Sequence, residues 1–193
     1  MLFADESVIP GWAIQRLGRE TGLRSQSQAG GDAVRWMARV PEANWQYIIL
    51  HHSAGFSGSV ESIHREHRQR KDVSGNPWLG IGYHFVIGNG QGMEDGLIQP
   101  TFRWNDQVHG AHSGNALFNA RGIGICLIGN FEQRPPTPAQ VKAVRDLVKT
   151  LSLRHQIPWD RIMGHGEVKA TACPGKHFPL KELREFVSDQ RSR

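Results

Sequence analysis

Apolar residues along this chain follow a strand pattern in some segments and a helical pattern in others. Runs rich in β-branched and aromatic residues at 45–51, 81–87 and 122–129 predict strands, because such side chains favour extended backbone. The third run is apolar at consecutive positions, so we expect a central strand that is buried on both faces. Residues 160–163 predict a further, short strand that leads to His165.

The most regular helix is predicted after Thr137. Thr137 supplies an N-cap, Pro138 suits the first helical position, and Gln140 completes a capping box. Pro158 then ends the helical pattern. Between these limits the apolar positions recur at helical spacing, at Val141, Val144, Leu147, Val148 and Leu151.

Two other segments show helical character. Residues 59–71 follow a Gly-rich turn and predict one helix, and a last helix is expected to begin near Pro179. Strands that alternate with helices indicate the α/β class, here a single domain with a central mixed β-sheet flanked by helices. The residues of the last helix that we expect to face inward are Leu180, Leu183, Phe186 and Val187.

The first 40 residues differ from the rest because they are mixed and weakly patterned. Gly30-Gly31 predicts a flexible joint, and Trp12 and Trp36 are candidate anchors on the domain. We interpret residues 1–40 as an irregular N-terminal extension and residues 41–190 as the main domain. A chain of 193 residues is long enough for one such domain with a real core.

The chain is basic, with a net charge of +5 and a pI near 9.6. This charge favours a polyanionic partner such as nucleic acid, anionic lipid or the acidic polymers of a bacterial wall. The basic residues are scattered, however, and the group between Arg65 and Lys71 is more typical of a solvated helix face. We find no run of the roughly 18–20 apolar residues that a membrane span needs. No signal peptide is visible either, so the sequence alone leaves the compartment open.

Candidate metal ligands stand at the end of one predicted strand and in a late loop. His51 and His52 close the first strand, and His165 and Cys173 lie eight residues apart. Imidazole and thiolate are ligands that zinc prefers, and a set of two or three with no obvious fourth describes a metal open to water. Because side chains alternate along a strand, only one of His51 and His52 can reach such a metal. Their spacing does not tell which one.

An open zinc site is typical of a hydrolase, and two other interpretations compete with it. A structural zinc domain needs four protein ligands, and we find no fourth cysteine or histidine at suitable spacing. A cysteine peptidase would pair Cys173 with a histidine. Cys126 lies inside the apolar run at 122–129, so we interpret it as a buried thiol rather than as a disulfide partner of Cys173.

Five blocks in order resemble the type 2 N-acetylmuramoyl-L-alanine amidases, the family shared by phage lysozyme-like amidases and peptidoglycan recognition proteins. The resemblance covers roughly residues 45–180. It implies that residues 41–190 form an amidase catalytic domain, which uses Zn²⁺ to hydrolyse the amide between N-acetylmuramic acid and L-alanine in peptidoglycan. The blocks are Ile48–Ala54, Gly80–Ile87, Gly110–His112, Gly122–Phe131 and Gly164–Gly175.

The same resemblance implies the partners and the location. Peptidoglycan or muropeptides are the expected partners of a monomer that binds no nucleic acid, and the cell envelope, the periplasm or the outside of the cell is the expected place. The alternative within this family is a non-catalytic peptidoglycan-binding protein. Such relatives are expected to lose a metal ligand, whereas this chain keeps the whole set.

Carried over by position, the resemblance makes His51, the first of the histidine pair, a zinc ligand together with His165 and Cys173. It makes Tyr83 a catalytic hydroxyl beside the metal. Thr171, two residues before the cysteine, stands where some members have lysine and recognition proteins have threonine, and it is a candidate oxyanion donor. One subgroup places a glutamate where this chain has Cys126, so a glutamate-based proton route does not transfer.

Three further residues are candidate substrate contacts. His112 and Asn115 lie in a Gly-rich loop that the resemblance makes part of the sugar–peptide cleft. Arg103 suits a stem-peptide carboxylate because guanidinium pairs with carboxylate through two hydrogen bonds. A solvated arginine is the alternative interpretation of Arg103.

Overall fold

The computed structural model describes residues 36–72 and 74–191. The predicted joint at Gly30-Gly31, the candidate anchor Trp12 and nearly all of the predicted extension lie outside these residues. The division of the chain at residue 40 therefore stays a prediction. Within the described part of the chain, no helix is both long and apolar enough to cross a bilayer.

A mixed five-stranded sheet forms the centre of the domain, with the strand order β3-β2-β4-β1-β5. The middle strand β4 runs parallel to both of its neighbours, β1 also pairs in parallel with β5, and β3 is antiparallel to β2. The predicted α/β class and the mixed sheet are confirmed. The strands are β1 (Tyr47–His52), β2 (Phe85–Ile87), β3 (Ile98–Pro100), β4 (Gly122–Leu127) and β5 (Ile162–Gly164).

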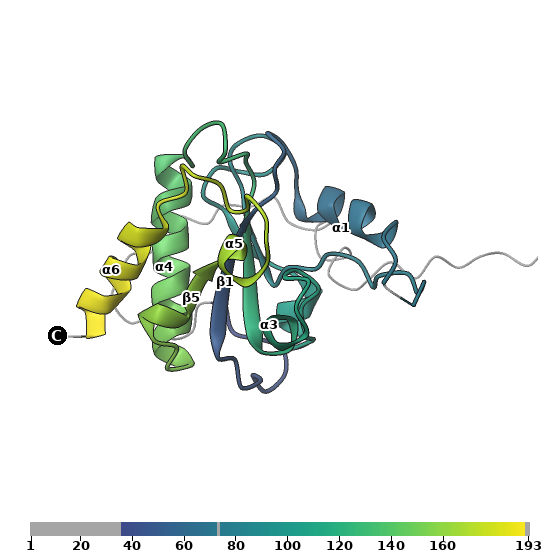
Figure 1. Ribbon diagram of the computed structural model, residues 1–193, viewed down its shortest axis with the longest axis horizontal. Coiled ribbons are helices and arrows are strands. Elements are labelled where there is room, and N and C mark those ends of the chain that lie inside the picture. Colours follow the sequence, from purple (N-terminus) through teal and green to yellow (C-terminus); the bar gives the residue numbers. More distant parts are fainter. Residues whose placement is uncertain (1–35, 73, 192–193) are drawn as a thin grey trace, which may run out of the picture. The chain divides into compact units, whose positions relative to one another are not determined.

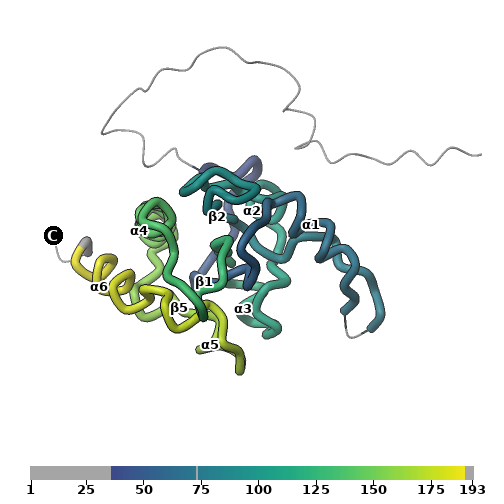
Figure 2. The backbone as a smooth tube through the Cα atoms, turned by 90° about the horizontal axis from the view of Figure 1, so that it is seen from above, coloured from purple at the N-terminus to yellow at the C-terminus, as the bar shows by residue number. Residues whose placement is uncertain are grey.

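Helices lie on both sides of this sheet (Figures 1 and 2). The long helix α4 and the C-terminal helix α6 lie on one side, while α3 and, further out, α1 lie on the other. The helices are α1 (Val60–Arg68), α2 (Phe102–Asn105), α3 (Ala116–Arg121), α4 (Pro138–Arg154), α5 (His165–Val168) and α6 (Leu180–Arg191), with a 3-10 turn η2 (Trp159–Arg161).

The two faces of the sheet differ in chemistry. On one face, Ile48 and Leu50 of β1 join a buried apolar core that includes Val144 and Leu147 of α4. On the other face His51 lies in register with Cys126, and the neighbouring positions of β4 are glycines, at Gly122 and Gly124. Because strand side chains alternate, the pattern Gly-Ile-Gly-Ile-Cys of β4 fills the core on one face and leaves room on the other.

Helix α4 forms as its sequence predicts. The Thr137 hydroxyl accepts a hydrogen bond from the Gln140 amide, and the Gln140 side chain accepts one from the Thr137 amide. The Gln140 side chain is buried, and it also donates to the carbonyl oxygens of Ile87 and Ile128. The cap therefore also ties the start of α4 to the ends of β2 and β4.

The second predicted strand is shorter than expected, because only residues 85–87 of the run 81–87 are strand β2. Before β2 the chain lies against a loop, where the Gly82 carbonyl accepts a hydrogen bond from the Ala111 amide. A Cβ atom at Gly82 would lie 2.3 Å from the Ala111 oxygen, so this approach requires glycine. The short elements β3, α2, α3 and α5 carry too few residues for a periodic signal, and the sequence did not predict them.

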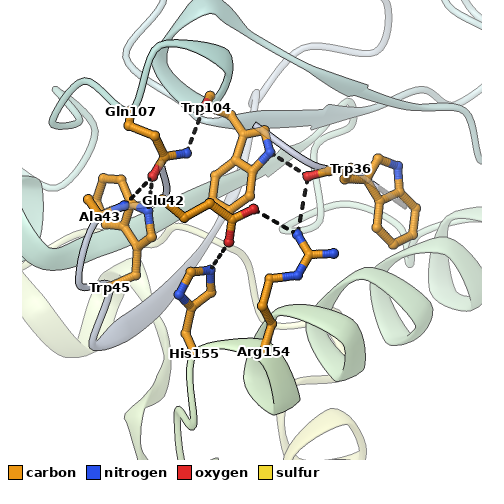
Figure 3. A network of polar contacts seen from close by, with 8 residues as sticks. All are labelled: Trp36, Glu42, Ala43, Trp45, Trp104, Gln107, Arg154 and His155. Atoms are coloured by element: carbon orange, nitrogen blue, oxygen red, sulfur yellow. Dashed lines mark hydrogen bonds and ion pairs between the residues drawn. The ribbon is translucent and has the colours of Figure 1, made fainter. Parts of the chain in front are cut away.

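Residues 36–45 bind to the domain through a polar network (Figure 3). The Glu42 carboxylate lies 3.0 Å from Arg154 Nη1 and 3.0 Å from His155 Nε2, at the end of α4. The Trp36 carbonyl accepts hydrogen bonds from Trp104 Nε1 and Arg154 Nη1. The Trp36 side chain also packs against the core, which confirms its predicted role as an anchor.

Candidate metal centre and cleft

Three potential metal ligands converge at one edge of the sheet. His51 is the penultimate residue of β1 and His165 follows β5, and because these strands are parallel neighbours, their carboxyl ends meet at the same edge. Cys173 reaches the same place from the loop after α5. The ligand atoms of His51, His165 and Cys173 all lie within 4.8 Å of one another, and Cys173 Sγ is 3.7 Å from His51 Nδ1.

This geometry fits a zinc ion. Zn–N distances of about 2.0–2.1 Å and a Zn–S distance of about 2.3 Å in a tetrahedral site place nitrogen and sulfur about 3.6 Å apart. His165 Nε2 lies 3.0 Å from the Ser113 carbonyl oxygen, which leaves Nδ1 for a metal. Burial raises the pKa of the Cys173 thiol to about 11, and the His52 backbone amide, which donates to Sγ at 3.4 Å, partly offsets this shift. His51 Nε2 lies 3.0 Å from His112 Nδ1, so each ligand has a partner outside the metal position, as metal-binding side chains usually do.

The structure brings His51 and not His52 to this group. His52 points to the opposite face of the sheet, where its Nδ1 accepts a hydrogen bond from the Phe131 amide at 3.1 Å. Its ring lies 6.0 Å from the Phe131 ring. The alternation of side chains along β1 therefore separates the two histidines as the sequence predicts. His52 binds the loop after β4.

Tyr83 lies beside the candidate metal ligands. Its ring centroid is 5.1 Å from that of His51 and 5.5 Å from that of His67. The phenol lies near the Cys126 thiol, which projects from β4 on the same face as His51. Burial raises the pKa of the Tyr83 phenol well above its usual value, and the nearby thiols of Cys126 and Cys173 add to this shift. The hydroxyl is therefore protonated at neutral pH.

Thr171 is exposed in the loop that carries Cys173. Its hydroxyl oxygen accepts a hydrogen bond from the Cys173 amide at 3.3 Å, and the Cys173 carbonyl accepts one from the Gly166 amide at 2.6 Å. These two bonds fold the loop back on itself and hold the thiol toward His51. The Glu167 carboxylate accepts hydrogen bonds from the Gly164 amide and from Arg184.

A cleft of about 780 Å³ adjoins the candidate ligands. Its cationic side chains are Arg70, Lys71 and Lys169, which together outnumber the single carboxylate of Asp72. A smaller polar hollow of about 290 Å³ is also lined by His67, Arg70 and Tyr83. The other side chains of the larger cleft include Trp78, Tyr83, His109, His112, Asn119 and His165.

The residues predicted to contact the substrate differ in their burial and in whether they line the cleft. Arg103 is only 2 % exposed, and its guanidinium donates to the carbonyl oxygens of Ile81 and His109. It holds two loops together and does not line the cleft, so its predicted contact with stem-peptide carboxylates is not supported. Asn115 is exposed at the N-terminus of α3, where its side chain accepts from the Leu117 amide at 3.0 Å. A substrate contact of Asn115 stays a prediction.

His112 does line the cleft, but it is 7 % exposed and both of its ring nitrogens have partners inside the protein. Its Nδ1 lies 3.0 Å from His51 Nε2, and its Nε2 lies 3.2 Å from the Gly122 carbonyl oxygen. The sequence did not predict the cleft residues Lys169 and Asn119. The Asn119 side-chain oxygen accepts from the His112 amide and thereby holds the loop.

Burial lowers the pKa of the histidines around this site. The pKa of His112 falls to about 3 and that of His67 to about 4, while that of His51 lies well below its usual value. Burial is the main cause in each case, and nearby histidines or arginines add to it. These imidazoles are therefore neutral at physiological pH, which is the state that binds a metal.

Comparison with known proteins agrees with this fold and site. The family model described as N-acetylmuramoyl-L-alanine amidase matches residues 41–176, and the chain belongs to this family. The chain is similar to peptidoglycan-recognition protein SC2 of Drosophila melanogaster, with 33% identity over 167 residues and 84% of each chain covered. It is also similar to the N-acetylmuramoyl-L-alanine amidase of Homo sapiens, with 28% identity over 67% of this chain and 22% of that protein.

Two solved structures extend the comparison. The endolysin N-acetylmuramoyl-L-alanine amidase LysCS from Clostridium intestinale matches with a TM-score of 0.61 and 30% identity, over 77% of this chain and 89% of that chain. A mutant of Drosophila PGRP-LB, in complex with tracheal cytotoxin, matches with a TM-score of 0.55 and 26% identity, over 78% of this chain and 89% of that chain. Relatives therefore include proteins named as amidases and proteins named for recognition.

Proposed function

We propose that this protein is a zinc-dependent N-acetylmuramoyl-L-alanine amidase, which cuts the amide between muramic acid and the stem peptide of bacterial peptidoglycan. The observation that carries the proposal is the group of His51, His165 and Cys173, whose ligand atoms lie within 4.8 Å of one another. Among the described residues this group has no fourth histidine, cysteine or carboxylate, so a zinc ion held there keeps a position for water.

The metal supplies Lewis acidity when it is bound, which activates water near neutral pH and polarises the scissile carbonyl. The protein then stabilises the oxyanion of the tetrahedral intermediate and delivers a proton to the leaving amine. One positioned donor is typically worth roughly 3–4 kcal/mol to such an intermediate.

Tyr83 is the proposed donor beside the metal ligands. Its raised pKa keeps the phenol protonated, so the hydroxyl can donate to the oxyanion or pass a proton toward the leaving nitrogen. Its position next to the His51 ring and at the wall of the cleft supports this role.

Thr171 is the proposed second donor. The hydroxyl oxygen accepts from the Cys173 amide, which leaves its own proton available to a substrate oxygen. A threonine is neutral, so it lacks the positive charge of the lysine that some family members have at this place. On the protein side, Tyr83 would therefore carry more of the oxyanion stabilisation.

The positive charge of the cleft favours a substrate that carries carboxylates. Three cationic side chains, Arg70, Lys71 and Lys169, line it together with several neutral histidines. Stem peptides of peptidoglycan carry free carboxylates, which such cations bind favourably. We accordingly propose peptidoglycan or muropeptides as the partner, a monomer as the active form, and the cell envelope, the periplasm or the outside of the cell as the place of action.

The competing function is peptidoglycan recognition without cleavage, because the similar Drosophila protein SC2 is named as a recognition protein. The complete set of His51, His165, Cys173 and Tyr83 favours the enzyme, since a receptor has no need of an open metal.

Mass spectrometry of products from a defined muropeptide tests the proposal, with zinc-loaded protein and with chelator-treated protein. We expect a free stem peptide that begins with L-alanine and a muramic acid with a free lactyl carboxylate. Both products should disappear with the chelator and return with added zinc. Zinc-loaded protein that binds the muropeptide and releases nothing would establish the recognition function instead.

A further inference from the structure

The His112 ring lies in a slot lined by glycines behind the candidate metal ligands. A Cβ atom at Gly124 would lie 2.5 Å from His112 Cδ2, and a Cβ atom at Gly110 would lie 2.3 Å from the same atom. No real Cβ atom approaches that closely, so both positions require glycine. The slot holds the imidazole edge to face with His51, at a centroid distance of 5.0 Å and an interplanar angle of 79°.

The hydrogen bonds of the His112 ring determine the tautomer of His112, and this in turn determines the tautomer of His51. The Gly122 carbonyl oxygen only accepts, so His112 Nε2 must carry the hydrogen across the 3.2 Å contact. Nδ1 of a neutral His112 is then an acceptor, and it receives the hydrogen of His51 Nε2 across 3.0 Å. His51 Nδ1 is left with its lone pair exposed, and this is the atom 3.7 Å from Cys173 Sγ.

We propose that His112 is a positioning residue of the metal centre, which sets the tautomer and the ring orientation of His51. The inference rests on the proposed function, because it takes His51 as a zinc ligand. It replaces the predicted substrate contact, since neither ring nitrogen of His112 is left for a substrate. The partner of a metal-bound histidine is usually a carboxylate, a carbonyl or water. Here an imidazole anchored on the β4 backbone takes that place.

Zinc affinity of the full chain, measured by competition with a chromophoric chelator, tests the inference without using activity. His112→Phe keeps an aromatic ring in the slot but removes the acceptor, so we expect zinc to bind about 10- to 100-fold more weakly. His112→Asn places an amide oxygen near the position of Nδ1, and we expect it to recover part of that loss.

His84 provides the matched control. It is fully buried on the same side of the sheet, 5.8 Å from the His112 ring, and both of its nitrogens bond to the backbone, at Gly124 and Val108. It contacts no candidate ligand through these bonds. His84→Phe should therefore lower the melting temperature and leave zinc affinity within about twofold, whereas His112→Phe should weaken zinc binding.

Nitrogen NMR of histidine-labelled, zinc-loaded wild-type protein keeps the test independent of how the variants fold. We expect a hydrogen on Nε2 of both His51 and His112, with Nδ1 of His112 unprotonated. A hydrogen on His112 Nδ1, wild-type zinc affinity in folded His112→Phe, or an equal loss in His84→Phe would each overturn the inference. If wild-type protein binds no zinc, or His165→Ala binds it equally well, the proposed function fails instead.

Discussion

Replacement of Tyr83 by phenylalanine separates catalysis from metal binding and folding. The phenylalanine ring keeps the packing against His51 and His67, whose ring centroids lie 5.1 and 5.5 Å away. Only the hydroxyl is lost, together with its polar contact with the Cys126 thiol. Loss of one polar contact costs about 0.5–1.5 kcal/mol of stability. The melting temperature should therefore fall by no more than about 2–6 °C in a domain of this size.

The cost to turnover is expected to be far larger. Loss of one positioned donor to a tetrahedral oxyanion typically removes roughly 3–4 kcal/mol, which corresponds to about 10²–10³ in kcat. If the metal carries part of that load, the loss still reaches about tenfold. The assay is stem-peptide release from a defined muropeptide at saturating substrate, with zinc content measured on the same sample.

Tyr47→Phe is the matched control, because Tyr47 is the only other tyrosine in the chain. It lies at the start of β1, with its ring 5.0 Å from Phe118, at the opposite end of the strand from His51. Its replacement should leave turnover unchanged. Turnover of Tyr83→Phe within about threefold of wild type, with zinc retained, would remove Tyr83 from the mechanism.

The other predictions concern the metal, the loop and stability. His165→Ala and Cys173→Ala should each lose bound zinc and amidase activity together, as metal analysis and product assays will show; activity without zinc would contradict the open-metal account. Thr171→Lys should retain activity in the same assay, since an ammonium replaces the neutral donor, and complete loss would argue against an oxyanion role. Glu42→Gln removes a half-buried carboxylate from between two basic groups at the end of α4, so urea unfolding should show a loss of about 1–3 kcal/mol. His67 has a folded pKa of about 4, below the unfolded value of 6.5, so the unfolded state binds more protons between these pH values. Stability of the metal-free protein should then fall as the pH drops from about 6.5 to 4. His67 contributes up to about 1.4 kcal/mol per pH unit to this fall, and His67→Gln should reduce the slope by that amount.

The sequence predicted the elements whose signals are local. Thr137, Pro138 and Gln140 predict the start of α4, and the structure forms the predicted capping box. The central position of β4 follows from apolar side chains at consecutive positions, which only a strand buried on both faces tolerates. The pairing of His51 rather than His52 with the late loop needed the family resemblance, because alternation along β1 does not reveal which face meets that loop.

The roles of Arg103 and His112 were beyond sequence reasoning for a physical reason. Each depends on which backbone carbonyls the folded chain brings to the side chain: Ile81 and His109 for Arg103, and Gly122 for His112. An arginine in a four-residue helix gives no local sign of burial. The glycines at 110 and 124 were the available signal for His112, because the absence of a Cβ atom at both positions leaves room for its ring.

X-ray absorption spectroscopy of the zinc-loaded protein measures the coordination shell itself. We expect two nitrogen neighbours at about 2.0–2.1 Å, one sulfur at about 2.3 Å and one oxygen of exchangeable solvent. The sulfur should vanish in Cys173→Ala, in any zinc that variant retains. A shell of four protein nitrogen and sulfur ligands with no solvent oxygen would contradict this expectation, because a closed site cannot activate water.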